Sequence, residues 1–377
     1  MAEPLKHLLN DGVPPRIAAM LKRAWRGFDT AAFLRQIEPG YEGLALMQRG
    51  QRIAEALHTH LPPDVPRALD VLTDSLDPPM GLDAKGEPDA GDRSYSAFLY
   101  LPHSMYIATH GLPHLDDAMR AQHALTQRFT AEFSLRPYLL HQREATLRHL
   151  HAWAQDDNAH VRRAASEGTR PRLPWAPRLP AFQKDPMLAL PLLDMLKDDP
   201  SSYVRRSVAN HLGDIAKDHP EAAVATARGW LRGAGPEREA LVRHGLRFLI
   251  KQGHAGALDA LGVGHAVALD VSAARFTPRS ARIGGKLRIE ADLHNPGKHP
   301  QRVLADLQVH YVKASGDTAP KVFKLSTVEI APGDTVTLGK TLSLAQMTTR
   351  THYPGRHAVA LLLNGRNQPL GHFDLTA

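Results

Sequence analysis

Residues 156–175 read DDNAHVRRAASEGTRPRLPW, and this stretch decides the fold. Asp156 and Asp157 are of the type that caps the start of a helix, and small or apolar residues then recur at helical spacing. These residues are Val161, Ala164, Ala165 and Gly168. The run RPRLPW at 170–175 contains two prolines, which stop a helix. The stretch therefore predicts a helix followed by a stiff, positively charged loop that ends in Trp175.

One side of this helix is polar. Arg163, Glu167 and Arg170 lie three or four residues apart, so they share a side roughly opposite the apolar stripe. One interpretation is a solvated face whose charges pair between adjacent turns. The other is a binding surface, and the next stretch of chain favours it.

The next stretch repeats the first. Residues 199–214 read DPSSYVRRSVANHLGD, and the tripeptide Val-Arg-Arg at 204–206 repeats the one at 161–163 after 43 residues. A looser copy, Val-Arg-His, follows 38 residues later at 242–244. A period of about 40 to 47 residues is typical of two-helix HEAT-type units, which stack into a solenoid because no unit buries its own apolar face.

The second copy preserves the polar side. The face of the second copy that matches Arg163, Glu167 and Arg170 carries a similar set of side chains, namely Arg206, Asn210 and Asp214. Two successive repeats thus present an arginine with a polar or acidic residue at the same place. The concave binding surface of a solenoid requires such a repetition.

Length and composition set the class of protein. A chain of 377 residues is long enough for two domains, and 43% hydrophobic with 23% charged residues is ordinary for a globular protein. No apolar run approaches the roughly 18 to 20 residues of a membrane span, and MAEPLKHLLNDG lacks the apolar core of a signal peptide. We therefore expect a cytoplasmic protein with no membrane partner.

Composition also limits the chemistry. The chain has no cysteine, which excludes disulfides, thiolate metal sites and cysteine nucleophiles. Its 22 histidines show no HExxH or comparable ligand spacing, so we expect neither a metal site nor another cofactor. A net charge of +7 and a pI near 9.6 fit a polyanionic partner.

The N-terminal part of the chain reads as helical. We expect two or three helices in residues 1–75, an exposed loop rich in Pro, Gly and Asp at 74–94, and an aromatic core segment at 95–106. Residues 143–153 continue as a basic helix, and helices follow to about Leu261. We expect the closed solenoid to be a monomer.

A carboxylate stands out in the helix expected near residues 115–136. Leu125, Phe129 and Phe133 form its expected buried stripe, and Glu132 falls beside them. Such a carboxylate is not on the solvated face. Either it bonds Arg128 or Arg136 as a structural pair, or it faces a cleft that binds a cation.

The pattern changes from period 3.6 to period 2 at about residue 267. The expected strands are 266–276, 286–293, 303–312, 322–330, 335–342 and 357–363, with turns at 295–297, 315–317, 332–334 and 364–365. Six or seven strands in about 110 residues describe an immunoglobulin-like sandwich without its disulfide. The predicted fold is thus mostly α, a HEAT-like-repeat α-solenoid over residues 1–262 followed by a C-terminal all-β immunoglobulin-like sandwich over 265–377.

The sandwich carries a modest set of basic residues, which could clasp DNA. They are Lys286, Arg288, Lys298, His299 and Arg302. A purely structural or protein-binding role for this domain is the alternative.

Three motifs carry a resemblance to a known family. They are RFTAEFSLRP at 128–137, VRRAASEGTRPRLPW at 161–175 and SVANHLGDIAKDHP at 207–220. The chain resembles the AlkC branch of the HEAT-like-repeat DNA alkylation-repair glycosylases, relatives of the AlkD-type enzymes. The resemblance extends over nearly the whole chain, because one subgroup of that family appends an immunoglobulin-like domain.

The resemblance implies a monofunctional glycosylase of base excision repair that removes cationic alkylated bases, chiefly N3-methyladenine, from duplex DNA. Glu132, Glu167 and Trp175 fall on motif positions that the family uses near the lesion, with Asp214 on a neighbouring one. Alkylation makes the base a good leaving group, so carboxylates need only stabilise an oxocarbenium-like sugar and direct water. The resemblance also suggests action without full extrusion of the base.

The remaining assignments concern DNA contacts. We expect phosphates of the damaged duplex to be held by a polar set consisting of Arg163, Arg170, Arg172, Arg206 and Asn210. Trp175 either packs against the deoxyribose or the cationic base, or is a core tryptophan pinned by the two prolines. The competing hypothesis for the whole chain is a non-catalytic HEAT-repeat scaffold that binds DNA or a protein.

Overall fold

The computed structural model describes residues 5–83, 87, 95–263, 267–347 and 350–377. Contacts divide the chain into two compact units. The first unit comprises residues 1–219 and 233–245, and the second comprises 220–232 and 246–377. The expected boundary near 262–265 and the start of the first expected strand at 266 fall partly on residues outside the described ones.

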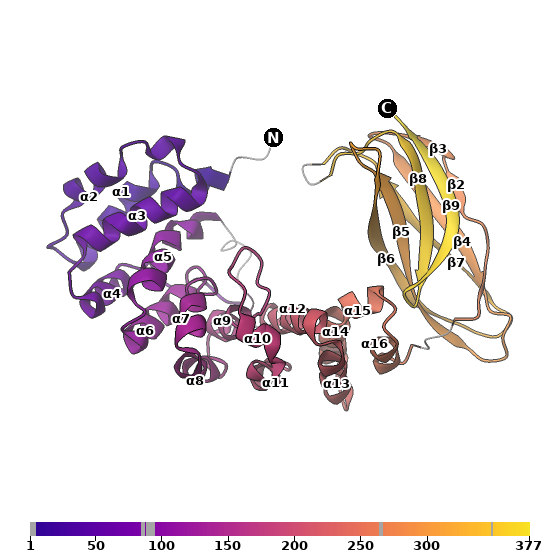
Figure 1. The fold of residues 1–377 in the computed structure, drawn as a ribbon, viewed down its shortest axis with the longest axis horizontal. Helices are drawn as coiled ribbons and strands as arrows, with labels where there is room; N and C mark the ends of the chain where they lie inside the picture. The colour runs from indigo at the N-terminus through magenta and orange to yellow at the C-terminus, as the bar shows by residue number, and fades with distance from the viewer. Residues whose placement is uncertain (1–4, 84–86, 88–94, 264–266, 348–349) are drawn as a thin grey trace. The chain divides into compact units, whose positions relative to one another are not determined.

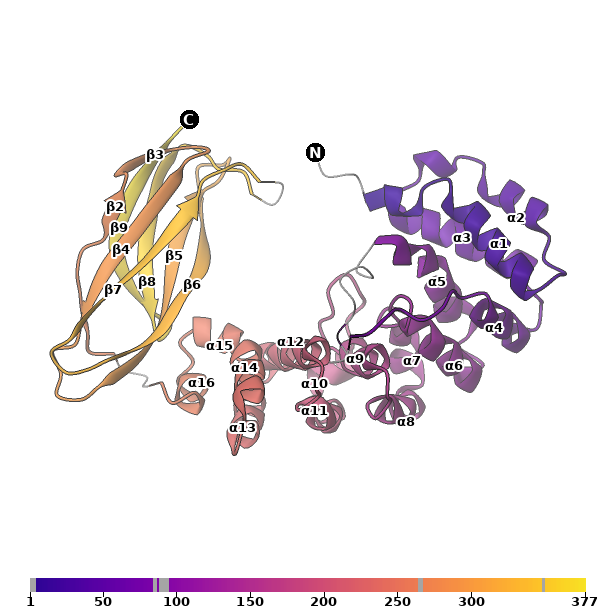
Figure 2. The same cartoon turned by 180° about the vertical axis from the view of Figure 1, so that it is seen from behind.

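The first unit is built of α-helices. Four helices fill the region in which two or three were expected, namely α1 (Val13–Ala24), α2 (Thr30–Ile37), α3 (Leu46–His60) and α4 (Val65–Asp74). The others are α5 (Leu101–His110), α6 (Leu115–Thr126), α7 (Leu135–His141), α8 (Arg143–Trp153), α9 (Ala159–Gly168), α10 (Pro180–Lys184), α11 (Leu190–Leu196), α12 (Ser202–Asp218) and α14 (Pro236–Gly245). Within this unit, α3, α5, α7, α9 and α12 follow one another along one side, and α4, α6, α8 and α11 along the other (Figure 1, and from behind in Figure 2).

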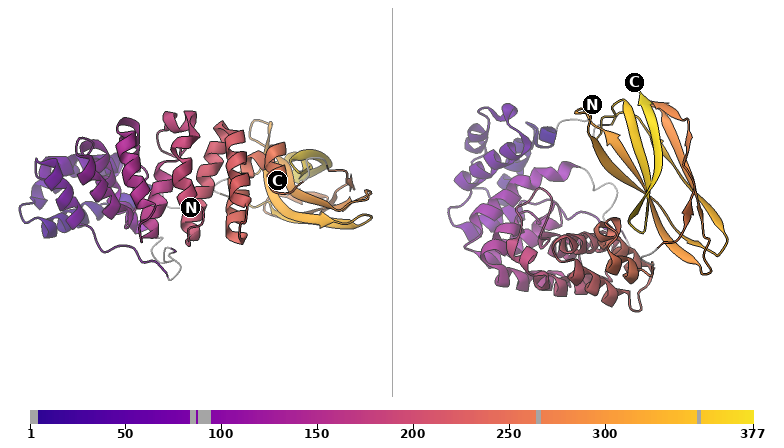
Figure 3. Two further views of the ribbon diagram at one scale, coloured as in Figure 1. Left: turned by 90° about the horizontal axis from the view of Figure 1, so that it is seen from below. Right: turned by 45° about the vertical axis from the view of Figure 1, so that its right-hand side comes forward.

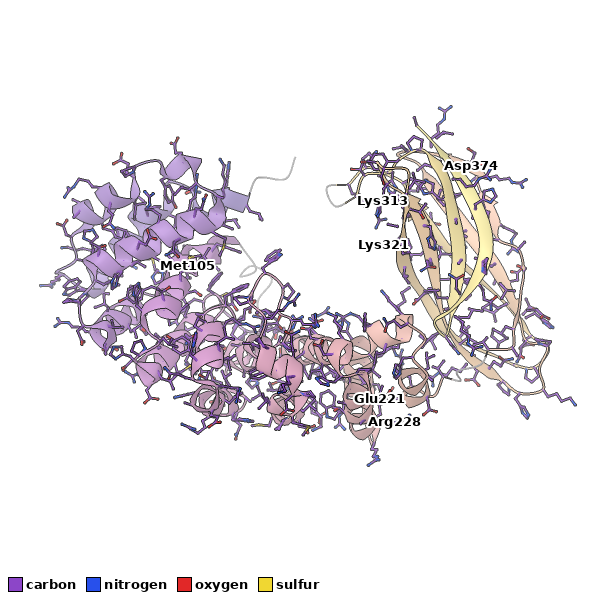
Figure 4. The ribbon with its side chains drawn as sticks, in the orientation of Figure 1. Met105, Glu221, Arg228, Lys313, Lys321 and Asp374 are labelled. Carbon is purple, nitrogen blue, oxygen red and sulfur yellow. The ribbon has the colours of Figure 1, made fainter. Side chains whose placement is uncertain are left out.

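Helices α3, α5, α7, α9, α12 and α14 pack closely against their neighbours in this row at glycines. A Cβ on Gly168 of α9 would lie 2.6 Å from Cδ1 of Leu135 in α7, and one on Gly245 of α14 would lie 2.8 Å from Cδ2 of Leu212 in α12. A Cβ on Gly50 of α3 would likewise lie 3.0 Å from Sδ of Met105 in α5, a residue labelled in Figure 4. The glycine in the apolar stripe of residues 156–175 is thus a site of helix packing.

The internal repeat has a structural counterpart. Arg162 Nη1 donates to the carbonyls of Asp156 and Asp157, both at 2.9 Å. Arg205 Nη1 likewise donates to the carbonyls of Asp199 and Pro200, at 2.5 and 2.8 Å. In both repeats, therefore, the first arginine of Val-Arg-Arg closes the loop that precedes its own helix.

The expected cap of α9 was wrong by one residue. Asn158 is the N-cap, and its side chain accepts from the amide of His160 at 2.8 Å. The carboxylate of Asp156 accepts instead from the amide of Asn158, also at 2.8 Å, so it shapes the turn before the helix.

The expected single helix over 115–136 was also wrong. Helix α6 ends at Thr126, and α7 begins only at Leu135. The amides of Arg128 and Phe129 both bond the carbonyl of Leu125 at 2.9 Å, which tightens the end of α6. Glu132 consequently lies in the connection between two helices rather than on a helix face.

In its described residues, the second unit joins three helices to nine strands. The helices are α13 (Pro220–Leu231), α15 (Arg247–Lys251) and α16 (Ala255–Ala260). The strands are β1 (Asp270–Val271), β2 (Arg275–Thr277), β3 (Ser280–Arg282), β4 (Lys286–His294), β5 (Gln301–Val312), β6 (Thr318–Ile330), β7 (Thr335–Ser343), β8 (Gly355–Leu363) and β9 (Arg366–Thr376). They form a sheet ordered β1-β4-β2, with β7 also on β4, and a sheet ordered β3-β9-β8-β5-β6. Figure 3 shows the strands as two facing layers.

The sandwich confirms the predicted fold class. Inward residues alternate along β4 and β5, and they share one core that includes Leu287, Leu293, Leu307 and Val309. The expected list lacked the final strand β9, although it placed the turn at 364–365 that leads into it. Proline and several polar residues interrupt the apolar pattern of β9, because much of this strand is exposed.

Helices and strands of the second unit are tied together by direct contacts. A Cβ on Gly365, in the β8–β9 turn, would lie 2.3 Å from the backbone of Gly253. Helix α13 is joined to the residues of α16 and its N-cap by two side-chain pairs whose α13 members are shown in Figure 4. The pairs are Arg228 with Asp259 at 2.9 Å and Glu221 with His254 at 3.2 Å.

Candidate active site

Three carboxylates from different elements lie close together in the first unit. Glu132 precedes α7, Glu167 is in the last turn of α9, and Asp214 is in the second half of α12. Their exposed fractions are 8%, 6% and 2%. Three buried carboxylates need opposite charges beside them, because an unpaired buried charge is costly.

Two arginines supply those charges. Arg163 Nη1 binds Glu132 Oε2, while its Nη2 lies 3.7 Å from Glu167 Oε1. Arg170 Nη1 binds the same Glu167 oxygen at 2.5 Å, and its Nε binds Asp214 Oδ2 at 2.8 Å. The carboxylates and arginines therefore alternate in an ion-pair ladder of five residues, with Glu132 and Asp214 at its ends.

Hydroxyl and ammonium groups complete the ladder. Ser207 Oγ donates to Glu167 Oε2 at 2.6 Å, and Lys217 Nζ donates to Asp214 Oδ1 at 3.0 Å. Both oxygens of Glu167 and both oxygens of Asp214 thus accept hydrogen bonds from the protein. These two carboxylates are fixed in place and fully engaged.

Charge pairing outweighs burial in this ladder. Burial by itself would raise the pKa of Glu167, but Arg163, Arg170 and the Ser207 hydrogen bond lower it below its usual value. Burial would lower the pKa of Arg163, yet the neighbouring Glu132 carboxylate raises it. Arg163 and Glu167 are therefore both charged at neutral pH.

Glu132 differs from the other two carboxylates. Its Oε2 receives both Arg163 and the hydroxyl of Thr130. Its Oε1 has no hydrogen-bond partner among the residues that the structure describes. Glu132 is thus held by one oxygen, and the other is available to a ligand.

These contacts overturn one interpretation and change the partner in another, because Glu132 pairs with an arginine other than those expected. The side of α9 that carries Arg163 and Glu167 is not a solvated face, because its side chains are largely buried against Glu132 and α12. Neither expected structural partner of Glu132 binds it. Arg128 donates to the carbonyls of Asp77 and Ala124, and Arg136 donates only to carbonyls.

Trp175 is displayed on the surface. Its exposed fraction is 92%, so the interpretation as a core tryptophan was wrong. Its backbone has a φ of 62°, in the left-handed region that non-glycine residues adopt at a cost of about 1 to 2 kcal/mol. Such a conformation persists only when the surroundings enforce it.

The surroundings of Trp175 are rigid. Arg136, which is buried, donates to the carbonyls of Gly168, Arg170 and Pro177 at 3.0, 2.7 and 3.0 Å, and so binds both ends of the loop. Leu173 is buried as well. Burial lowers the pKa of Arg136 to about 10, so the guanidinium stays charged at neutral pH.

The expected DNA-binding residues fall into two groups. Arg163, Arg170 and Arg172 bind carboxylates of the protein, Arg172 through its Nε to Asp218 Oδ2 at 2.8 Å. Asn210 Oδ1 lies 3.0 Å from Nε2 of His244, whereas Arg206 is exposed.

The basic residues of the sandwich do not form one patch. Lys286 begins β4 and pairs with Ser343, whereas Lys298, His299 and Arg302 lie around the turn beyond its other end. Along a strand, the eight steps of β4 span roughly 26 Å. Any contact of these residues with a polyanion involves two separate places.

The sequence interpretation missed three residues of the site. Thr130 binds Glu132, Ser207 binds Glu167, and the ring of Tyr203 lies 5.3 Å from the guanidinium carbon of Arg163. Ser207 carried a signal, because it takes the place of Ala164 in the preceding repeat and puts a hydroxyl on a small-residue stripe. The Thr130 contact joins residues two positions apart within RFTAEFSLRP, whereas the Tyr203 contact depends on tertiary structure alone.

Two further properties concern the described residues as a whole. They contain no group of three or more His, Asp or Glu side chains arranged to hold a metal ion. None of their helices has the length and apolar character required to cross a membrane.

Comparisons with known proteins give relatives over the full length. The family model of the C-terminal Ig-like domain of the uncharacterised protein YhaZ matches residues 270–377. The YhaZ protein of Bacillus subtilis strain 168 is 32% identical over 362 residues, which are 96% of each chain. The solved structure of the Pseudomonas fluorescens alkylpurine DNA glycosylase AlkC, bound to DNA containing an abasic site analogue, superimposes with a TM-score of 0.85. That protein is 38% identical, and the match covers 99% of this chain and 100% of AlkC.

Proposed function

The chain belongs to the family of AlkC and YhaZ, and we propose from this membership that it is a DNA glycosylase that releases alkylated purines from DNA. The relative with a stated activity is an alkylpurine DNA glycosylase. The net charge of +7 suits a DNA partner. We propose cationic bases, chiefly N3-methyladenine in duplex DNA, as the substrates, and a monofunctional reaction.

The available oxygen of Glu132 is the observation that carries the mechanism. An alkylated purine is already cationic, so it leaves without a general acid. The sugar then develops positive charge, which a carboxylate stabilises while it directs water to the anomeric carbon. Glu132 Oε1 is free for both tasks, whereas the oxygens of Glu167 and Asp214 are occupied.

The rest of the ladder positions Glu132. Arg163 holds its Oε2, Glu167 holds Arg163, and Arg170 with Asp214 closes the far end. The ladder fixes the working carboxylate before the substrate arrives, which is the preorganisation that catalysis by charge requires.

Trp175 and Arg206 have the exposure needed to touch DNA. We assign to Trp175 a contact with the deoxyribose or a cation–π contact with the alkylated base. Arg206 is the member of the arginine set best placed to bind a backbone phosphate, because it is exposed. We further propose that the base is cleaved without full extrusion from the helix. A fluorescent base beside the lesion that reports complete extrusion before cleavage would contradict this.

Release of methylated bases from alkylated duplex DNA tests the function. We expect release by the wild type, a loss of about 100-fold or more in folded Glu132→Gln, and a smaller loss in Glu167→Gln. Circular dichroism checks that each variant folds. No release by the wild type, with DNA still bound, would indicate a non-catalytic scaffold, and an equal loss in both variants would remove the distinction between the two carboxylates.

A further inference from the structure

A carboxylate from a distant segment sits on the N-terminus of α12. Glu87 accepts hydrogen bonds from the amide of Ser202 through one oxygen, and from the amide of Tyr203 through the other at 3.2 Å. The first amides of a helix have no partner within it and carry partial positive charge. With 17 residues, α12 is the longest helix described, so this end is a strong site for an anion.

The same helix end holds an unused donor. Ser201 is the N-cap of α12, yet its side chain makes no capping hydrogen bond. The residue is fully buried, and its Oγ has no partner within the described part of the chain. A capping serine ordinarily accepts from an amide of the first turn. Here Glu87 has taken that function, and the buried Ser201 hydroxyl at the N-cap keeps an unused donor next to these amides.

This anion site adjoins the ion-pair ladder. Tyr203, whose amide binds Glu87, also places its ring 5.3 Å from the guanidinium carbon of Arg163. The exposed Arg206 follows Ser202 by four residues, so both lie on the same side of α12. An anion on the two amides would thus lie on the helix whose Tyr203 ring packs against Arg163, with the exposed Arg206 one turn further along.

We propose that the N-terminus of α12 is a binding site for a DNA backbone phosphate, and that Glu87 occupies it in the free protein. A phosphodiester presents two anionic oxygens, as a carboxylate does, and suits backbone amides at a helix start. DNA binding exchanges Glu87 for the phosphate, so Glu87 lowers the affinity for DNA. The proposal rests on DNA being the ligand of this protein, and not on base release.

Charge removal at Glu87 gives the first test. We expect Glu87→Gln to bind undamaged duplex DNA about three- to tenfold more tightly, measured by fluorescence anisotropy at fixed salt. Asp70→Asn is the matched control, because it removes the same charge from an exposed position on α4. An affinity that is unchanged, or that rises no more than in Asp70→Asn, would overturn the exchange.

Removal of an amide gives the second test. Ser202 is the first residue of α12, where proline is well tolerated, and the preceding Ser201 has the extended backbone that proline requires. In the Glu87→Gln background, Ser202→Pro deletes one donor without changing charge. We expect it to weaken DNA binding about three- to tenfold relative to Glu87→Gln. Equal affinities of the two proteins would show that the amides hold no phosphate.

A direct measurement on the wild type tests the proposal even if the variants fail to fold. The backbone amide signals of Ser202 and Tyr203 should shift when duplex DNA is added, because the acceptor changes. Inorganic phosphate at the same phosphate concentration separates a general anion site from one that requires the duplex. Unshifted signals under DNA saturation would overturn the proposal. Base release plays no part in these readouts, so they stand or fall independently of the glycosylase activity.

Discussion

At the scale of single residues, the two glutamates of the ladder have the same chemistry but differ in how many of their oxygens are hydrogen-bonded. Glu132 keeps an oxygen for a ligand, while Glu167 accepts from Arg170 and Ser207 and lies beside Arg163. Removing the charge of Glu167 leaves two arginines with one fewer partner in a buried place. The consequence is a difference in stability as well as in activity.

We expect Glu167→Gln to lower the free energy of unfolding by about 1.5 to 3 kcal/mol, the usual worth of hydrogen bonds to a buried charge. Glu132→Gln should cost less than half of that, because only one of its oxygens is bonded. Urea denaturation at neutral pH measures both. Equal losses of unfolding free energy would mean that both carboxylates stabilise the fold to the same extent and that neither keeps an oxygen for a ligand.

Buried histidines give a pH dependence at the same scale. Burial lowers the pKa of His103 from 6.5 to about 4, and neither ring nitrogen has a partner among the described residues. Because the unfolded chain binds the proton at higher pH than the native state, stability is lost as pH falls from 6.5 towards 4. The loss attributable to His103 is about 1.4 kcal/mol per pH unit in this window.

His103→Phe should remove that contribution and flatten the dependence of unfolding free energy on pH between 6.5 and 4.5. His7→Phe, at an exposed position, is the control and should leave the slope as in the wild type. A slope that is unchanged in His103→Phe would mean that this histidine is not buried as a neutral ring.

The sequence identified the carboxylates but not their partners. Glu132, Glu167 and Asp214 belong to recognisable motifs, and helical spacing brings Glu167 close to Arg170. The pairing of Glu132 with Arg163 joins residues from different helical pairs, 31 positions apart. Local periodicity contains no information on such a contact, so the sequence favoured Arg128 and Arg136 simply because they are near.

At the scale of elements, the loop after α9 is built to present one side chain. Its ends are bound by Arg136, its middle is anchored by Leu173, and Trp175 projects from it with a positive φ. The prolines in the motif predicted a stiff loop, but they could not indicate whether the tryptophan points inward. That depends on Arg136, which α7 contributes from an earlier helical pair.

Trp175→Gly separates the contribution of the exposed indole to activity from its contribution to stability. Glycine adopts a φ of 62° without penalty, and the exposed indole contributes little to the core. We expect thermal denaturation to show equal or slightly higher stability, by up to about 1 kcal/mol, together with a loss of base release of tenfold or more. Trp175→Phe should retain part of the activity, and full activity in the glycine variant would deny the indole any contact with DNA.

At the scale of the whole chain, the repeat and the change of period predicted both architectures, while the transition between them was harder to place. Helices α15 and α16 look like a continuation of the solenoid in the sequence. By contacts they belong with the sandwich, because Gly253 packs against the backbone of Gly365. A contact between residues more than 100 positions apart is invisible to periodicity.

We propose that residues 1–262 fold alone and that the sandwich adds affinity for DNA. The first unit has contacts of its own and a buried cluster that runs from α1 to α7, so a fragment ending at 262 should retain its helical circular dichroism. Its last helices lose the packing partner of Gly253, and amide exchange should be faster in α15 and α16 than in the full chain.

The DNA affinity of that fragment tests whether the basic residues of the sandwich contact DNA. If Lys286 at one place and Lys298 with Arg302 at another neutralise two or three phosphates, the slope of log affinity against log salt should become shallower by about 0.9 for each phosphate lost. Full-length Lys298→Gln with Arg302→Gln controls for the removal of a folded domain and should reproduce part of the change. A fragment with the affinity and salt slope of the full chain would assign the sandwich a structural or protein-binding role instead.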